Sequence, residues 1–267
     1  MKILLIGITH PVVEKLYQKL YKDNQVRFIH YKKLNTNIME AVDNERFDLV
    51  VSLAPIWKLK NMIKEKGIIF SKIIALSSTS VMSKSNSNIL DDKRLSNLYI
   101  DGENDIIEIS KSYKATYKIF RTTMLWGHNY DLNISRIIRI AKKFRFIIFP
   151  FPSSGLRAPI HFDSLSDFLF KKITSSHNKV SEIVVIAGDK IYKLNEIINI
   201  ISKKYKSLKF PIFISYKIMT YLGIITKLKI FNFIAGFIER SNKNLDFHKI
   251  KNMEIELIPQ ETLDKII

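Results

Sequence analysis

Hydroxyl side chains gather where a predicted strand, Lys72–Ser78, gives way to a loop, because residues 77–80 read Ser-Ser-Thr-Ser. A hydroxyl at such a position can donate a hydrogen bond to a carbonyl or alkoxide oxygen on which negative charge develops during a reaction. The alternative is that the hydroxyls satisfy backbone groups of the loop itself. The cluster is therefore a candidate reaction centre, and the elements around it decide what it can act on.

The charge of the chain narrows its possible partners. The 267 residues include 43 Lys and Arg against 25 Asp and Glu, a formal net charge of +18. Such a charge commonly serves nucleic acids or anionic membrane surfaces. The lysines are spread through nearly every segment, which disfavours nucleic-acid binding. A basic face for polyanionic or membrane-linked substrates stays open. The chain has no cysteine and no H-x-x-x-H pair among its six histidines, so no metal site is expected.

Predicted strands and helices alternate along the first half of the chain. The predicted strands are 2–7, 25–31, 47–54, 72–78 and 117–124, and the helices between them are 11–22, 35–43, 55–66 and 91–112. This alternation predicts an α/β fold with a Rossmann-like doubly wound parallel sheet. Later segments, a helix from 133, a helix from 163 or 164, a strand at 182–187, a helix at 194–206 and a largely helical 212–240, predict a small, mainly helical C-terminal lobe.

Several motifs follow one another in the central stretch, 117–169. Residues 121–127 read R-T-T-M-L-W-G, a helix with a basic face follows, and residues 157–163 read R-A-P-I-H-F-D before a further helix. This order resembles the second half of the extended short-chain dehydrogenases/reductases, the group of NAD-dependent epimerases and dehydratases of nucleotide sugars. Members typically show R-P-x-x-x-Y-G and later R-x-x-I/V-H-V-x-D. Residues 239–247 are also similar to a C-terminal segment of some epimerase-like members, so the resemblance covers most of the chain.

The resemblance gives the hydroxyl cluster a role. Residues 77–82 are similar to a family segment, S-S-x-x-V-Y-G, in which a Ser or Thr hydroxyl bonds the sugar oxygen being oxidised. Counting back from Val81 makes Ser78 the candidate catalytic residue, with Thr79 beside it. The family also uses a Tyr-x-x-x-Lys pair, which is absent between residues 85 and 115. The nearest pattern joins Tyr99 to Glu103, and a carboxylate there would raise the pKa of the phenol, contrary to what a general base needs.

The first βα turn is the expected cofactor site. The family usually has G-x-x-G-x-x-G here, whose glycines let the backbone approach a pyrophosphate. In this chain only Gly7 matches, and His10 and Val13 replace the other glycines. The predicted cofactor-binding residues are Gly7, Ile8, Thr9, His10, Tyr31, Lys32, Leu53 and Ala54. Lys32 and Lys33 slightly favour NADP over NAD, because a base accommodates the 2′-phosphate. Two solvated lysines are an equally good interpretation.

Arg157 is the expected anchor of the substrate. In the resembling enzymes an arginine at this place grips the diphosphate of the nucleotide sugar, a task that suits a planar and permanently charged fork. Asn133 and Arg136 can assist from the preceding helix. The alternative is that Arg157 is a surface arginine. We expect His161 to pack under the sheet and Asp163 to cap the helix that follows.

The most apolar region, 210–238, is interrupted by Lys217, Lys227 and Lys229. It therefore falls short of the roughly 20 uninterrupted apolar residues that a membrane span needs. We expect amphipathic helices that cover the core instead. No signal peptide is recognisable, so a cytoplasmic location is expected, with peripheral contact at the inner face of the membrane left open.

Taken together, these features predict two regions, a dinucleotide-binding region at 1–127 and a substrate-binding lobe at 128–267 interleaved with the last sheet strands. The expected function is that of an NAD(P)-dependent epimerase, dehydratase or reductase acting on a nucleotide sugar or another phosphate-bearing sugar, in surface polysaccharide biosynthesis. The alternative is a non-catalytic binding or scaffolding protein that has lost the Tyr/Lys pair. A homodimer is compatible with either function.

Overall fold

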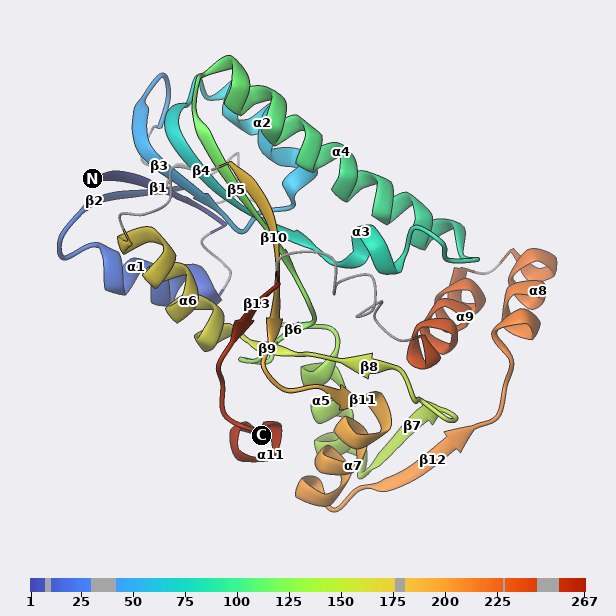
Figure 1. The fold of residues 1–267 in the computed structure, drawn as a ribbon. Coiled ribbons are helices and arrows are strands. Elements are labelled where there is room, and N and C mark those ends of the chain that lie inside the picture. Colours follow the sequence, from blue (N-terminus) through green and yellow to red (C-terminus); the bar gives the residue numbers. More distant parts are fainter. Residues whose placement is uncertain (8–10, 30–41, 176–180, 228, 244–254) are drawn as a thin grey trace.

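Seven parallel strands form the central sheet of the computed structural model, which describes residues 1–7, 11–29, 42–175, 181–227, 229–243 and 255–267 (Figure 1). The order across the sheet is β13-β10-β5-β4-β3-β1-β2. The strands are β1 (Lys2–Ile6), β2 (Gln25–Ile29), β3 (Arg46–Ser52), β4 (Ile69–Ser78), β5 (Thr116–Thr122), β10 (Glu182–Gly188) and β13 (Ile255–Ile258). The Rossmann-like α/β fold expected from the sequence is confirmed.

Helices cover both faces of this sheet, which is why its strands read as continuous apolar runs. On one face lie α1 (Pro11–Leu20) and α6 (Phe162–Thr174), and on the other lie α2 (Ile56–Glu65) and α4 (Leu90–Ser112) (Figure 1). Alternate residues of β1 enter the two cores: Ile3 and Leu5 pack toward α1 and α6, and Leu4 and Ile6 toward α2 and α4. All four are fully buried.

The strand order reverses beside β1, which pairs with β2 on one side and with β3 on the other. In open α/β sheets, ligands bind outside the carboxyl ends of the strands at such a switch point. Gly7 follows β1 there, and Leu53 and Ala54 follow β3. Five of the predicted cofactor residues, Ile8, Thr9, His10, Tyr31 and Lys32, lie outside the described residues, as does most of the helix expected at 35–43.

The second half of the chain returns to the sheet twice, through β10 and β13, as the predicted interleaving requires. Its remaining elements form a mainly helical lobe with three short strand pairs (Figure 1). The lobe contains α5 (Ile134–Phe144), α7 (Leu194–Tyr205) and α11 (Leu263–Ile266), together with β6 (Leu125–Trp126) and β9 (Ile160–His161), β8 (Leu156–Arg157) and β11 (Tyr192–Lys193), and β7 (Phe146–Pro150) and β12 (Leu208–Ile212). The boundary at residue 127 stays a prediction.

Several strands did not emerge from the sequence pattern, β7, β12 and β13 among them. The residues of β12 are almost all exposed, one of them is Pro211, and the strand pairs only with β7 among the described residues. A strand of this kind buries no alternating apolar face, so no period of two is visible. The predicted strand Tyr117–Met124 ends earlier, at Thr122, and the chain then forms β6, which pairs with β9.

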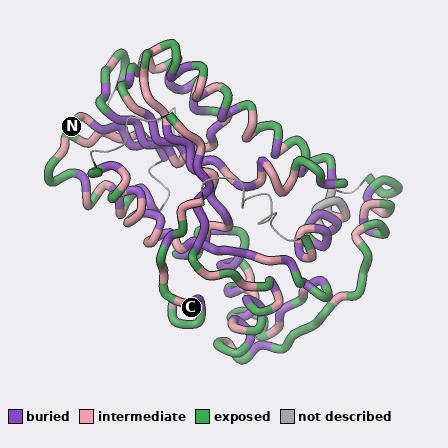
Figure 2. The backbone as a smooth tube through the Cα atoms, in the orientation of Figure 1, coloured by how far each residue is buried: buried purple, intermediate pink, exposed green. Residues whose placement is uncertain are grey.

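The region 212–240 is largely helical, as expected, and forms α8 (Tyr216–Thr226) and α9 (Lys229–Asn242). The expectation that these helices cover the core is wrong for α8, whose buried residues are only Met219 and Gly223. The helix lies at the periphery beside α9 and is largely exposed (Figures 1 and 2). None of the helices in the described segments has the length and apolar composition that a bilayer crossing needs.

Candidate functional site

A single cleft of about 1030 Å³ runs along the carboxyl ends of the strands and into the lobe. It brings together every predicted site residue that the structure describes: Gly7, Leu53, Ala54, Ser78, Thr79, Asn133, Arg136 and Arg157 all line it. These residues come from the ends of β1, β3 and β4 and from α5 and β8, which are far apart in the sequence. The cleft therefore joins the predicted cofactor end to the predicted substrate end.

The cofactor end is built around Gly7. Its φ of +104° lies in the region that glycine adopts readily and other residues rarely do. A Cβ added here would lie 3.3 Å from the backbone nitrogen of Ala54 and 3.3 Å from the carbonyl carbon of Leu53. The backbones that follow β1 and β3 thus approach each other closely, and only a glycine fits between them without strain. The arrangement leaves backbone, rather than side chain, facing the cleft at the switch point.

The hydroxyl end of the cleft consists of Ser77, Ser78, Thr79 and Tyr99. The Ser78 hydroxyl is half-buried and lies 3.0 Å from the Ser80 hydroxyl, and it also accepts a hydrogen bond from the Ser80 backbone N–H. Thr79 is buried, and its hydroxyl donates to the backbone carbonyl of Thr122 over 3.2 Å. Of the two candidate catalytic residues, Ser78 therefore keeps a hydroxyl that can turn toward a ligand, whereas Thr79 joins β4 to β5.

A buried ion pair stands where the family pattern would place a lysine. Glu103 of α4 is 3% exposed and accepts two hydrogen bonds from Arg121 of β5, at 2.9 Å to Nε and 2.6 Å to Nη2. The same carboxylate accepts a hydrogen bond from the Ser77 hydroxyl at 2.5 Å. Bidentate pairing between a guanidinium and a carboxylate is among the strongest contacts that proteins make. Arg121 therefore neutralises the carboxylate and fixes α4 against the sheet.

This pairing corrects the expected cause of the Tyr99 pKa. We expected the carboxylate to raise the pKa of the phenol. The pKa is indeed raised above its ordinary value, but burial raises it, and a hydrogen bond with Ser78 acts in the opposite direction. The Tyr99 ring packs edge-to-face on Trp57, with the ring centroids 5.0 Å apart. Tyr99 thus stays protonated at neutral pH and lies beside Ser78 in the cleft.

The cationic end of the cleft consists of Lys84, Arg136, Arg157, Arg240 and Lys243. Asp92 of α4 is 6% exposed and forms ion pairs with both Lys84 and Arg240. Burial acts to raise the pKa of Asp92, but these two cations outweigh burial and hold the pKa below its ordinary range. The network ties α4 to α9 at the wall of the cleft.

Arg157 is buried, with 8% of its area exposed, and is not a surface arginine. Its guanidinium donates to three backbone carbonyls, those of Leu156 at 2.6 Å, Lys243 at 3.1 Å and Arg240 at 2.5 Å. Two of these carbonyls lie at the C-terminus of α9, where backbone oxygens lack helical partners and a cation is favourable. Burial, with the neighbouring charge of Arg240, lowers the pKa of Arg157 to about 10, so the group remains charged at neutral pH.

The N-terminus of α5 is held by an acid that the sequence analysis did not single out. The Asp131 carboxylate accepts hydrogen bonds from the backbone N–H groups of Asn133 at 2.8 Å, Ser135 at 3.2 Å and Gly127 at 3.1 Å. An acid shortly before a helix is an ordinary capping signal that could have identified it. Asn133 just before α5 and Arg136 on its first turn are both exposed at the cleft wall. Asp131 already occupies the anion-binding end of this helix, so a phosphate would meet side chains there.

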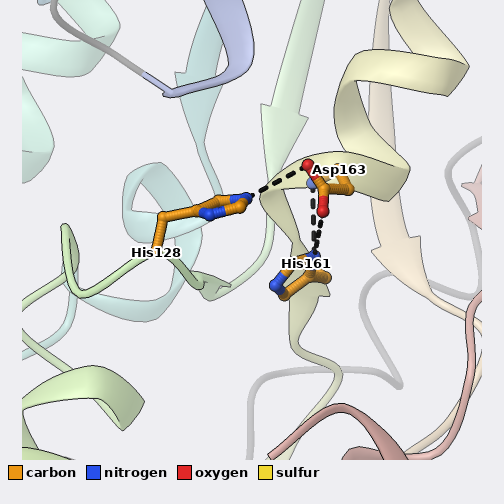
Figure 3. A group of neighbouring side chains, drawn as sticks. All are labelled: His128, His161 and Asp163. Atoms are coloured by element: carbon orange, nitrogen blue, oxygen red, sulfur yellow. Dashed lines mark hydrogen bonds and ion pairs between the residues drawn. The ribbon is translucent and has the colours of Figure 1, made fainter. Parts of the chain in front are cut away.

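One group among the described residues could hold a metal ion, although none was expected. His128, His161 and Asp163 bring one potential ligand atom each within 4.8 Å of the others (Figure 3). His128 Nε2 lies 3.1 Å from Asp163 Oδ1, and the ammonium of Lys15 lies 3.2 Å from the same oxygen. Burial acts to raise the pKa of Asp163, but these two neighbours outweigh burial and lower it. The Lys15 ammonium thus competes with a metal ion for this carboxylate oxygen.

The expected capping of α6 is also corrected. We expected Asp163 to cap this helix, but the cap is His161, whose Nδ1 accepts a hydrogen bond from the Asp163 backbone N–H at 3.3 Å (Figure 3). The His161 ring packs edge-to-face on Trp126 with centroids 4.9 Å apart. Burial is the main cause that lowers the pKa of His161, which keeps the ring neutral and its Nδ1 free to accept.

Comparisons with known proteins agree with this geometry at the level of the fold. No protein-family model matches the sequence, and no curated protein matches it either. Among solved structures, the UDP-glucuronic acid 4-epimerase from Bacillus cereus in complex with NAD is similar, with a TM-score of 0.64 and 16% identity, over 80% of this chain and 88% of that one.

Two further structures are similar over comparable lengths. The UDP-N-acetylglucosamine 4-epimerase from Bacillus cereus has a TM-score of 0.60 and 18% identity, over 80% of this chain and 88% of that one. The dTDP-glucose 4,6-dehydratase from Bacillus anthracis in complex with NAD has a TM-score of 0.57 and 12% identity, over 80% and 84% of the two chains. The chain therefore has the fold of NAD-dependent epimerases and dehydratases of nucleotide sugars.

Proposed function

We propose that the chain binds NAD and a nucleotide sugar in its cleft and acts as an epimerase, dehydratase or reductase on the sugar. The single observation that carries this proposal is the continuity of the cleft, which links Gly7 at the switch point, Ser78 and Tyr99 in the middle, and the arginines of the lobe. A dinucleotide, a sugar hydroxyl and a diphosphate each find suitable groups along one path. A role in surface polysaccharide assembly and a cytoplasmic location are parts of the proposal that rest on the resemblance of the sequence.

The residues at the switch point fit a dinucleotide. Gly7 presents backbone where a pyrophosphate has to approach closely, and Leu53 and Ala54 form the opposite wall. Bound NAD would accept a hydride from the carbon of a sugar hydroxyl and return it. We propose NAD as the cofactor, because two of the similar structures described above are complexes with NAD. The NADP preference rests on Lys32 and Lys33, outside the described residues, and is tested below.

Two residues of the hydroxyl end would handle the sugar oxygen. The Ser78 hydroxyl would bind that oxygen, since it lies half-buried at the end of β4 with a hydrogen that can turn toward the cleft. Tyr99, whose pKa burial raises, would hold its proton at neutral pH and donate a hydrogen bond rather than accept a proton. The substrate phosphates would lie at the cationic end, where Arg136 and Lys243 are exposed and Arg157 adds a fixed positive charge.

A second candidate function is binding without turnover. It is favoured by one specific observation: the charge one helical turn beyond Tyr99 belongs to Glu103, and Arg121 neutralises it. No cation among the described groups lowers the pKa of Tyr99, and a phenol that keeps its proton makes a poor general base. A protein of this kind would keep the fold and the cleft while presenting a nucleotide sugar to another protein.

Calorimetry with NADH, NADPH, UDP and UDP-sugars tests the proposal. We expect NADH and UDP-sugars to bind, and turnover to be followed separately by the formation of an epimer or of a dehydrated sugar. Binding of both ligands without turnover would support the second candidate. Failure of the purified chain to bind NADH, NADPH or any nucleotide sugar would reject both candidates. A tighter binding of NADPH than of NADH would support the sequence-based preference.

A further inference from the structure

We propose that the outer face of α8 and the segment before it form a docking surface for an anionic lipid bilayer. We call this the α8 surface and define it by Phe213, Ile214, Ile218, Tyr221, Ile224 and Ile225, all of them exposed. The exposed fraction reaches 74% for Phe213 and 68% for Ile224. Adjoining large apolar residues of this kind on a monomer mark an interaction site, because leaving them in water is costly.

The helix is apolar on two opposite sides, and within the described segments only one of them packs against other elements. Met219 packs with Ala235 and Ile238 of α9, with Tyr216 and Leu222 at the edges of this contact. The residues of the outer side repeat at the spacing of one helical face, positions 218, 221, 224 and 225. Figure 2 shows α8 at the edge of the molecule, with most of its residues exposed. The outer side therefore has no partner among the described residues.

The charge of the chain segment that carries the α8 surface identifies the occupant. No Asp or Glu stands between Glu196 and Glu239, a stretch that contains Lys203, Lys204, Lys206, Lys209, Lys217, Lys227 and Lys229. Lys217 lies on α8 beside the apolar residues, and Lys227 caps its C-terminus, both exposed. Lysines that flank apolar and tyrosine side chains are the pattern of a helix that lies in the interface of an anionic membrane.

A second copy of the chain fits the same surface less well. In a two-fold dimer the same patch would face itself, which would bring Lys217 and Lys227 of one copy toward those of the other, with no acid on α8 to balance them. Like charges placed face to face across an interface cost free energy. Phosphate headgroups supply the missing negative charge, and acyl chains take up the isoleucines. Crossing is not part of the proposal, since α8 has 11 residues and a span needs about 20.

The α8 surface adjoins the cleft. Phe213, Ile214 and Tyr216 help to line a cavity of about 520 Å³, and Lys243 lines both this cavity and the cleft. Docking through α8 would therefore hold the cationic end of the cleft near the headgroups. The inference is independent of the proposed function, because it rests on the exposure and charge of α8 alone.

Vesicle flotation of the full chain tests the proposal, with vesicles of phosphatidylcholine alone and with phosphatidylglycerol added. We expect binding to the anionic vesicles, weaker binding to the neutral ones, and release by high salt, because salt screens the lysines. The double change Ile224→Asp and Ile225→Asp should lower partitioning at least ten-fold. Lys217→Gln and Lys227→Gln should each lower it about five-fold, the share of one lysine near an anionic surface.

Exposed apolar residues on other elements provide the matched control. Tyr21→Asp and Leu98→Asp change residues that are 50% and 42% exposed, after α1 and on α4, and should leave partitioning unchanged. Thermal unfolding of each variant shows whether it is folded. The proposal is overturned if anionic vesicles do not bind the protein or if they bind the isoleucine variant equally well. It is also overturned if the isoleucine variant abolishes a dimer that forms without vesicles, since the surface would then belong to a second copy.

Discussion

Ser78 and Arg157 line the same cleft, but the fold holds their side chains in different ways. The Ser78 hydroxyl bonds only to a neighbouring serine and to Tyr99 among the groups described here, and it can exchange these contacts for a ligand. The Arg157 guanidinium already donates to three backbone carbonyls and fixes the end of α9. The resemblance of the surrounding motifs pointed to ligand binding in both cases. A side chain whose hydrogen bonds are already made to the protein supports the wall of the cleft, whereas one that can exchange its hydrogen bonds is available to a ligand.

Removal of the Glu103 carboxylate should give the largest effect, because it leaves Arg121 as an unpaired charge at the hydroxyl end. We expect Glu103→Gln to lower the free energy of unfolding by about 3–5 kcal/mol, as loss of one partner of a buried ion pair does. Urea unfolding measures this. The double variant Glu103→Met and Arg121→Met should recover most of the loss. Glu108→Gln, on the exposed side of the same helix, should leave the midpoint unchanged.

Ser78→Ala tests whether the hydroxyl that is available to a ligand acts in catalysis rather than in stability. If the protein turns over a nucleotide sugar, the loss of this hydroxyl should lower kcat about 10²-fold or more, the range found for one donor to a developing oxyanion. Stability should hardly change. Thr79→Val should do the reverse, costing about 1 kcal/mol of stability through its lost hydrogen bond to Thr122 while kcat changes little. Equal effects of the two changes on kcat would contradict the assignment.

Arg157→Ala should act first on stability. Each hydrogen bond from a charged group contributes roughly 1.5–3 kcal/mol, and three are lost, so the unfolding free energy should fall by at least one such amount. Arg157→Lys should recover less than half of it, because an ammonium cannot reach three carbonyls as a planar fork does.

Arg136→Ala is the matched change at an exposed site. It should weaken UDP binding about ten-fold with no loss of stability, and a variant that binds UDP normally would exclude Arg136 from the phosphate site.

The smallest effect concerns Tyr99 and pH. Burial raises the pKa of this phenol in the folded state above the value of about 10 that it has when unfolded. As the pH rises, the unfolded chain therefore loses this proton before the folded chain does. The contribution of Tyr99 to the free energy of unfolding is fully present below pH 10 and is lost as the pH rises through the folded pKa. Urea unfolding at pH 9 and pH 11 should show a smaller loss for Tyr99→Phe than for the unchanged chain. At neutral pH, Tyr99→Phe should leave any activity within a few fold.

The sequence by itself determined the parallel sheet and the positions of its first five strands. Uninterrupted apolar runs such as Ile3–Ile6 are buried on both faces, and a run of this kind needs helices on both sides. Gly7 follows the first of these runs and Ser78 ends the fourth, so both residues lie at one edge of the sheet. Carboxyl ends of parallel strands share an edge, so residues that follow different strands meet there.

Only the tertiary structure decided what those residues bond to. The sequence spacing placed Glu103 next to Tyr99 as a charge that would act on the phenol. Arg121, which neutralises the Glu103 carboxylate, comes from β5 and not from the helix that carries these two residues. Arg157 was expected to grip a phosphate, but two of its three carbonyl partners lie more than 80 residues later, at the C-terminal end of α9. Helical periodicity likewise could not show that one apolar side of α8 has no partner among the residues that the structure describes. Hydrogen bonding and burial depend on contacts between segments that are distant in the sequence. The local sequence pattern holds no information on those contacts.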